Sequence, residues 1–284
     1  MPHSDSPRHF FTATDGARLA YALDGPGNGL PVLCLAGLTR NRDDFLPALP
    51  GLSGCRVIRM DYRGRGDSDF TGPDSYTVAQ EAADALALLD HLGIEKAAIL
   101  GTSRGGLIAL LLAATAKERL LGICLNDIGP EIDLGGLGKI AARIGKAPQA
   151  RTLAEMAGLM AANSPGFTGL SLTDWQEMAG RLFTQHPDGL RLRYDPRLRD
   201  SFLAAFDPAQ PLPDLWPLWH GCDGLALALI RGANSDLLRE DTARKMREIQ
   251  PGLIFAEVPG RGHVPLLNEP QSITALTAWI GEMQ

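Results

Sequence analysis

The sequence predicts an α/β protein in which a mostly parallel sheet of eight strands is flanked by helices and carries a helical cap insertion. Three observations predict this fold class. Short apolar runs alternate with segments of helical spacing, which requires crossover connections between parallel strands. The alternation stops near residue 130 and resumes near residue 216. With 284 residues, 45% of them hydrophobic, the chain is long enough for one such unit with an insertion.

The expected strands begin with a hairpin, because residues 8–14 and 17–23 flank the turn pair Asp15-Gly16. The other six are short apolar runs of the kind found in strands that are covered on both faces. They span residues 31–36, 56–60, 97–100, 121–125, 225–230 and 254–258. A helix is expected over residues 77–92, where Thr77 and Gln80 form a capping box. Further core helices are expected over 107–116, around 240–249 and over 270–283.

Residues 131–215 contain no apolar strand run and read instead as amphipathic helical pieces at 153–162, 175–183 and 198–206. We therefore expect residues 1–130 and 216–284 to form the core and residues 131–215 to form the cap. A cap over the carboxyl edge of the sheet faces the site, so its large apolar side chains are candidates for a substrate pocket. The candidates are Met156, Met160, Trp175 and Met178, and plain packing onto the core is the alternative for each.

The composition excludes several classes of protein. A net charge of −6 and an isoelectric point near 5.5 argue against a protein that grips nucleic acid. The longest apolar stretch, residues 107–114, is too short to span a membrane, and the first residues have no apolar secretory signal. The four cysteines form no C-x-x-C pair. We expect a cytoplasmic protein with free thiols and neither nucleic acid nor membrane as a partner, of unknown oligomeric state.

A nucleophile is predicted where the stretch Gly101-Thr102-Ser103-Arg104-Gly105 follows the strand at 97–100 and opens a helix. This is a G-x-S-x-G pattern in a strand–turn–helix context, which is typical of a nucleophile elbow. The glycines leave room for a strained turn that exposes the serine Oγ. The positive end of the helix dipole favours a developing oxyanion. Ser103 is therefore the predicted nucleophile.

A serine needs a base and an orienting carboxylate. His263 lies in a glycine-bracketed loop after the last strand and is the predicted base. Asp236, in the turn after the strand at 225–230, is the predicted acid, which gives the chain order serine, aspartate, histidine. Asp127 competes for this role because it also ends a strand at the carboxyl edge, and an N-cap role is the other interpretation of Asp236. We favour Asp236.

The oxyanion hole requires two backbone N–H groups. One is expected from Arg104, directly after the nucleophile, and the other from Leu38 in the loop after the strand at 31–36.

The side chain of Arg104 has two possible roles. In the favoured one it turns away along its helix and pairs with a carboxylate such as Asp127 or Asp61. In the other it faces the pocket with Arg40 or Arg42 and binds an anionic group of the substrate.

These motifs, together with the segment Asp61-Tyr62-Arg63-Gly64-Arg65-Gly66-Asp67-Ser68, resemble the α/β-hydrolase family over most of the chain. Only the insertion resembles nothing specific. The resemblance implies a hydrolase with a Ser/Asp/His triad, and neither a metal nor an organic cofactor is implied. Residues 136–141 match a dinucleotide fingerprint by letter, but no apolar strand precedes them.

The sequence thus predicts a serine hydrolase that cleaves a carboxylic ester of a small, partly apolar substrate through an acyl-enzyme. A lactonase, a thioesterase or a hydrolase of carbon–carbon bonds would use the same triad. A ligand-binding receptor that kept the fold without turnover is the alternative from a different class.

Overall fold

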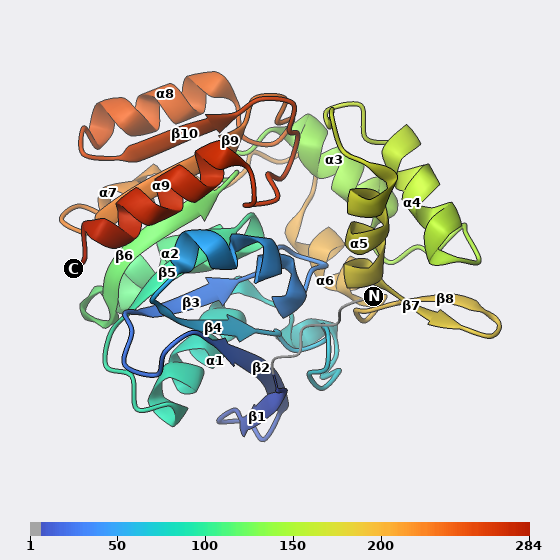
Figure 1. Ribbon diagram of the computed structural model, residues 1–284, viewed down its shortest axis with the longest axis horizontal. Helices are drawn as coiled ribbons and strands as arrows, with labels where there is room; N and C mark the ends of the chain where they lie inside the picture. Colours follow the sequence, from blue (N-terminus) through green and yellow to red (C-terminus); the bar gives the residue numbers. More distant parts are fainter. Residues whose placement is uncertain (1–6) are drawn as a thin grey trace.

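The computed structural model describes residues 7–284, and its centre is an eight-stranded sheet (Figure 1). In spatial order the strands are β1 (His9–Thr12), β2 (Arg18–Asp24), β4 (Arg56–Met60), β3 (Pro31–Leu35), β5 (Ala97–Thr102), β6 (Leu120–Asn126), β9 (Ala226–Gly232) and β10 (Ile254–Val258). β2 runs antiparallel to both of its neighbours, and all other pairs are parallel. The predicted fold class is confirmed.

Helices cover both faces of the sheet, which explains the continuous apolar runs of its central strands. On the front face in Figure 1, α9 (Pro270–Gly281) packs against the 3-10 helix η1 (Arg42–Leu52). Behind the sheet lie α1 (Val78–His91) and α2 (Arg104–Thr115). The remaining core helices are α7 (Trp216–His220) and α8 (Glu240–Ile249), and two short 3-10 turns span Pro73–Ser75 and Lys117–Arg119. The Thr77 side chain caps α1 by accepting a hydrogen bond from the Gln80 N–H at 3.1 Å, as the sequence predicted.

The insertion forms a separate lobe beside the sheet (Figure 1). Its helices are α3 (Leu134–Arg143), α4 (Leu153–Ala162), α5 (Leu172–Leu182) and α6 (Leu198–Ala205). It also contains an antiparallel hairpin of β7 (Phe183–His186) and β8 (Gly189–Leu192), so the expectation that the insertion has no strand is wrong. The hairpin escaped detection because its strands are only half-buried and mix polar with apolar residues.

The lobe has its own apolar core. Hydrogen bonds join it to the rest of the chain at two places. On one side the Thr168 N–H donates to the Gly260 carbonyl at 2.9 Å, in the loop after β10. On the other side the Gly66 N–H donates to the Arg193 carbonyl at 2.8 Å, and the Tyr76 hydroxyl reaches Asp195 at 2.6 Å. These bonds hold the insertion over the carboxyl edge of the sheet.

In the part of the chain that the structure describes, no helix is both long enough and apolar enough to cross a membrane. The four cysteines are free and buried.

Candidate active site

The nucleophile elbow is a sharp turn between β5 and α2. Ser103 has a φ of 50°, a backbone conformation that non-glycine residues rarely adopt. The flanking residues must be glycines, because a larger side chain at either position would clash with the backbone. A Cβ at Gly101 would lie 2.5 Å from the Gly105 carbonyl oxygen, and a Cβ at Gly105 would lie 1.9 Å from the Leu35 carbonyl oxygen. The G-x-S-x-G spacing therefore reflects the close approach of the turn to β3 and to its own helix.

His263 lies within hydrogen-bond distance of the nucleophile. The loop after β10 brings its Nε2 to 3.0 Å from Ser103 Oγ, although 160 residues separate the two in the chain. The imidazole is mostly buried, with 15% of the side chain exposed. The structure thus brings together the serine and the histidine that the sequence singled out.

The acid beside His263 is Asp127, not Asp236, and this corrects the sequence prediction. Asp127 follows β6 directly, and its Oδ2 lies 2.8 Å from His263 Nδ1. The Asp127 carboxylate is fully buried. Its Oδ1 accepts the Gly232 N–H at 2.8 Å, and its Oδ2 also accepts the Ser235 hydroxyl at 2.6 Å. These two donors fix the position of the carboxylate beside the imidazole.

Asp236 points away from the histidine toward the cap. Its side chain is 45% exposed, and its Oδ2 pairs with Lys139 Nζ of α3 at 2.6 Å. The turn of residues 232–236 still contributes to the site, because it supplies the two donors that hold Asp127. Sequence reasoning missed Gly232 and Ser235 because it looked in this turn for the carboxylate itself.

Asn126 connects the ends of three loops around the site. It is buried, and its backbone carbonyl accepts the Ser103 N–H at 3.0 Å. Its side-chain amide donates to Thr102 Oγ1 and to the Pro265 carbonyl, both at 3.1 Å. One amide therefore fixes the elbow relative to the histidine loop.

The two predicted oxyanion donors lie on either side of Ser103. Arg104 is the first residue of α2, so its N–H has no carbonyl partner within the helix. Leu38 lies in a tight turn that the Arg40 N–H closes onto the Gly37 carbonyl at 3.0 Å. A Cβ at Gly37 would lie 3.9 Å from Ser103 Cβ, which places this turn against the nucleophile. The arrangement is suited to two N–H groups converging on one oxyanion.

The Arg104 side chain turns away from the site, but its partner is neither Asp127 nor Asp61. Its Nε lies 2.5 Å from Glu81 Oε2, and its Nη2 donates to the Tyr76 carbonyl at 2.9 Å. Glu81 is completely buried and also pairs with Arg65 Nη1 at 2.8 Å. Burial lowers the pKa of the Arg65 guanidinium, and the charge of Glu81 opposes this shift.

The four pocket candidates lie in the cap. Met156, Trp175 and Met178 are buried in the cap's own apolar core, and Met160 packs against it. Leu266, three residues after His263, packs against the same cluster. Packing inside the cap therefore accounts for their burial, and contact with a substrate stays a prediction.

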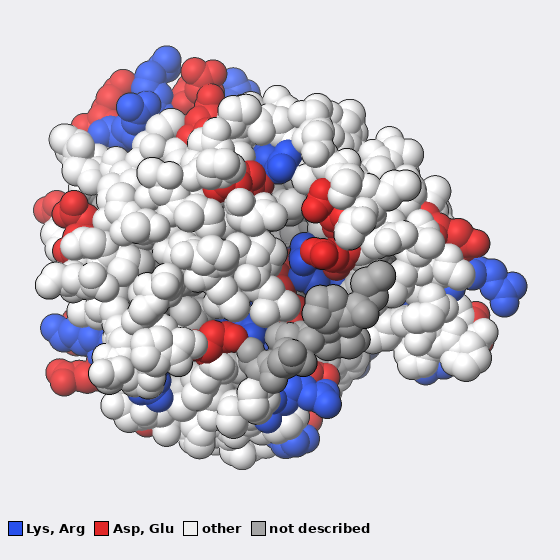
Figure 2. All heavy atoms as spheres, in the orientation of Figure 1, with Lys and Arg blue, Asp and Glu red and all other residues white. Residues whose placement is uncertain are grey.

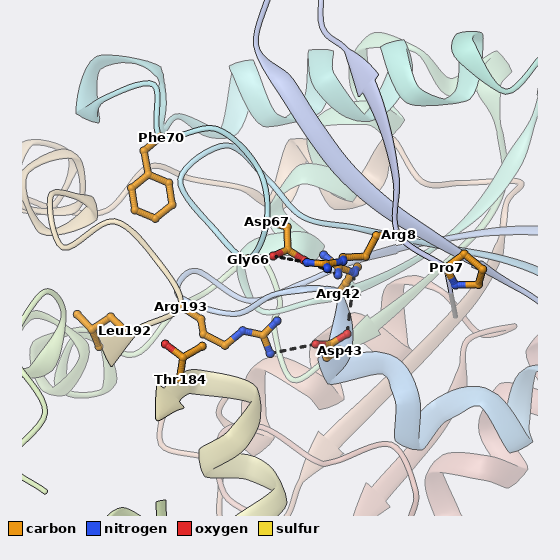
Figure 3. Close-up of a pocket in the computed structure, with 10 residues that line it drawn as sticks. All are labelled: Pro7, Arg8, Arg42, Asp43, Gly66, Asp67, Phe70, Thr184, Leu192 and Arg193. Atoms are coloured by element: carbon orange, nitrogen blue, oxygen red, sulfur yellow. Dashed lines mark hydrogen bonds and ion pairs between the residues drawn. The ribbon is translucent and has the colours of Figure 1, made fainter. Parts of the chain in front are cut away.

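A polar cavity of about 680 Å³ lies at another part of the seam between cap and core (Figure 3). Arg42, Asp67 and Arg193 are among its lining residues, whereas Ser103 and His263 are not. Its guanidinium groups are already paired. Arg42 Nη2 donates to Asp67 at 2.6 Å, and Arg193 Nη1 donates to Asp43 at 3.0 Å. This cavity is therefore separate from the candidate active site.

Comparisons with known proteins agree with this fold. A family model described as alpha/beta hydrolase fold matches residues 31–163. The chain is 32% identical to a 3-hydroxybutyrate-oligomer hydrolase from Cupriavidus necator over 90% of both chains. It is similar to a crystal structure of an alpha/beta hydrolase from Novosphingobium aromaticivorans, with 35% identity, a TM-score of 0.90 and 99% coverage of both chains. A 3-oxoadipate enol-lactonase from Acinetobacter baylyi is 32% identical over 43% of this chain and 45% of its own.

Proposed function

The chain belongs to the alpha/beta hydrolase fold family, and we propose that it is a serine esterase that acts through an acyl-enzyme. The observation that carries the proposal is the hydrogen-bonded series from Asp127 through His263 to Ser103, with contacts of 2.8 and 3.0 Å. A buried carboxylate, an imidazole and a serine in this order are the groups needed for nucleophilic attack on a carbonyl.

The geometry supports the following reaction. His263 Nε2 accepts the Ser103 proton while Oγ attacks the ester carbonyl, and Asp127 keeps the imidazole in the tautomer with a proton on Nδ1. The N–H groups of Leu38 and Arg104 stabilise the tetrahedral oxyanion. The imidazolium then protonates the departing alcohol. Water attacks the acyl-enzyme by the same route and releases the acid.

The substrate class follows from the full-length relative. A 3-hydroxybutyrate oligomer, the substrate named for the Cupriavidus protein, consists of short hydroxyacids joined by ester bonds. We propose short hydroxyacid esters of this kind as substrates. Lactones are the second candidate, because the enol-lactonase aligns with part of this chain, and a lactone is opened by the same attack on an ester carbonyl.

Steady-state turnover tests this proposal. The purified protein is expected to hydrolyse 3-hydroxybutyrate dimer and trimer and short-chain aryl esters. Ser103→Ala is expected to lower kcat by a factor on the order of 10⁵ or more, without change in the thermal unfolding midpoint. A folded wild-type protein that binds these esters without turning them over would instead be a ligand-binding relative. If the protein turns over lactones or thioesters faster than these esters, the proposed catalytic residues remain the same and the proposed substrate class is wrong.

A further inference from the structure

Two arginines, Arg40 and Arg181, meet at the seam between cap and core, and the stem of Arg40 lies beside the nucleophile. A Cβ built on Gly37 would lie 3.2 Å from Arg40 Cγ and 3.9 Å from Ser103 Cβ, so a single glycine separates the stem of Arg40 from Ser103. The cap meets the loop at the next residue, because Asn41 Nδ2 donates to the Arg181 carbonyl at the end of α5, at 2.6 Å. Arg40 and Arg181 therefore approach the same point from opposite lobes.

The two guanidinium groups share one carboxylate. Arg40 donates to Asp44 through Nε and, at 2.7 Å, through Nη2. Arg181 Nε lies 3.4 Å from Asp44 Oδ1. The side chains of Arg40, Arg181 and Asp44 remain 22%, 13% and 15% exposed, so a small solute can reach them. Two positive charges and one negative charge leave a surplus of one positive charge. Figure 2 shows charged side chains of both signs gathered along this seam.

Arg181 is the incompletely satisfied member of the group. Among residues 7–284 its guanidinium donates no hydrogen bond, and its Nε is buried. Burial lowers the pKa of Arg181, Asp44 opposes this, and Arg40 lowers the pKa further. A buried donor without an acceptor is costly. The Nη groups beside it also donate no hydrogen bond within residues 7–284, so the partly exposed guanidinium retains donors and charge for a further anion.

Neighbouring carboxylates do not fill this role. Glu177, one turn earlier on α5, is exposed, and Asp43 is held by Arg193 at 3.0 Å and by Arg59 at 3.6 Å. Arg193 is a useful contrast, because it also joins the cap to η1 but donates a regular hydrogen bond to its aspartate. Arg181 differs because its only carboxylate neighbour within 4 Å among the described residues, Asp44, already accepts two hydrogen bonds from Arg40.

We propose that Arg181 and Arg40 bind a carboxylate group of the substrate, so that the protein selects esters bearing a free carboxylate near the scissile bond. This inference rests on the proposed esterase function. The planar guanidinium fork matches a carboxylate through two parallel N–H bonds. A monoanion neutralises the surplus charge, whereas a phosphate dianion would exceed it. The acid end of a hydroxyacid dimer has this chemistry, and its ester carbonyl would then lie at Ser103.

The test compares the 3-hydroxybutyrate dimer with its primary amide, which has the same shape without the charge. The wild-type protein is expected to have a KM for the acid roughly tenfold to a hundredfold below that for the amide. Arg181→Met is expected to raise the KM of the acid to that of the amide, so that the preference for the acid is lost. Arg193→Met, the matched control, removes another cap–core ion pair and is expected to keep the preference for the acid.

A change in the opposite direction strengthens the test. Asp44→Asn removes the competing carboxylate and is expected to lower the KM of the acid by roughly tenfold relative to that of the amide, about the worth of one charged hydrogen bond. A purely structural ion pair gives no such gain. Arg181→Lys keeps the charge but loses the fork, so an intermediate KM is expected even if Arg181→Met folds poorly.

The outcomes separate the inference from the proposed function. Equal KM values for acid and amide in the wild-type protein overturn the inference and leave the esterase intact. Equal losses for both substrates in Arg181→Met and Arg193→Met show that Arg181 only anchors the cap, which also overturns it. Absence of any ester turnover, with no labelling of Ser103, refutes the proposed function itself.

Discussion

At the residue scale, the position of the acid is decided by the order of strands in the sheet. β6 lies between β5, which ends directly before Ser103, and β9, which ends at Gly232, the first residue of the turn at 232–236. Asp127, at the end of β6, therefore lies next to the nucleophile and within reach of His263, whose Nδ1 is 2.8 Å from its carboxylate. Asp236 lies beyond the end of β9, on the side where α3 of the cap supplies a lysine.

The first prediction separates these two aspartates. Asp127→Asn is expected to lower kcat/KM for an ester by about 10⁴-fold, because the amide no longer holds the imidazole in the working tautomer. Asp236→Asn removes an exposed ion pair with Lys139 and is expected to change kcat/KM by less than about threefold. Kinetics with a short aryl ester check both variants, and a larger loss in Asp236→Asn would restore the sequence-based assignment.

The sequence was sufficient to single out Ser103 and His263 because each has a local signal: the glycine-flanked elbow and the glycine-bracketed loop. The acid has no such signal. Asp127 and Asp236 both follow strands at the same edge of the sheet. What distinguishes them is which strand lies beside β5, and the polar hydrogens of Gly232 and Ser235 that stabilise one carboxylate. Both are long-range properties that a pattern along the chain does not contain.

At the element scale, a buried Arg–Glu–Arg group joins three segments behind the site. Glu81 of α1 pairs with Arg104 of α2 at 2.5 Å and with Arg65 at 2.8 Å, and Arg65 Nε donates to the Leu38 carbonyl at 2.9 Å. Leu38 and Arg104 are the residues whose N–H groups form the proposed oxyanion hole. Glu81 is therefore a positioning residue that ties the two donors to one helix.

Arg104→Met tests this group. Removal of the Arg104 guanidinium leaves Glu81 Oε2 and the Tyr76 carbonyl without their donor, while Arg65 still balances the charge of Glu81. The free energy of unfolding is therefore expected to fall by roughly 1–3 kcal/mol. Turnover of neutral and carboxylate-bearing esters is expected to fall by the same factor, because the side chain faces away from the substrate. Denaturant unfolding and kinetics with both esters measure these effects. A selective rise in KM for the acid alone would contradict the structural role.

Substitution of Gly105, the second glycine of the elbow, tests whether the turn requires a residue without a side chain. Gly105→Ala would place Cβ 1.9 Å from the Leu35 carbonyl oxygen of the buried strand β3, and we expect a loss of about 3 kcal/mol or more together with most of the activity. Gly158→Ala on α4 is the matched control. A Cβ there meets no atom within 4 Å, and the change is expected to stabilise the helix by up to about 1 kcal/mol. Thermal unfolding that ranks the two variants in the reverse order would refute this.

At the scale of the whole molecule, alternation of apolar and helical segments predicted the sheet, its flanking helices and the place of the insertion. It did not predict α3, α7 or the hairpin of β7 and β8, which are short or only partly buried. The pattern along the chain also could not show which contacts hold the cap against the core. The hydrogen bonds from Thr168 to Gly260 and from Gly66 to Arg193 join segments far apart in the chain.

The buried thiols give a prediction for the intact molecule. Cys34, Cys55, Cys124 and Cys222 are each fully buried, and burial raises the pKa of Cys222 to about 12. Because the thiolate is the reactive form, the native protein is expected to react with Ellman's reagent only on the timescale of unfolding. In denaturant four thiols per chain are expected to react at once. Rapid reaction of even one thiol in the native protein would show a more open core.

Covalent labelling with a fluorophosphonate tests the central claim most directly, because it reports the activated serine without requiring the natural substrate. Peptide mass analysis of the wild-type protein is expected to show one adduct, on Ser103, formed within minutes. His263→Ala is expected to show no adduct in that time, and Asp127→Asn only slow labelling, while Asp236→Asn labels like the wild type. A wild-type protein that is folded but unlabelled, or labelled on another residue, would contradict the account.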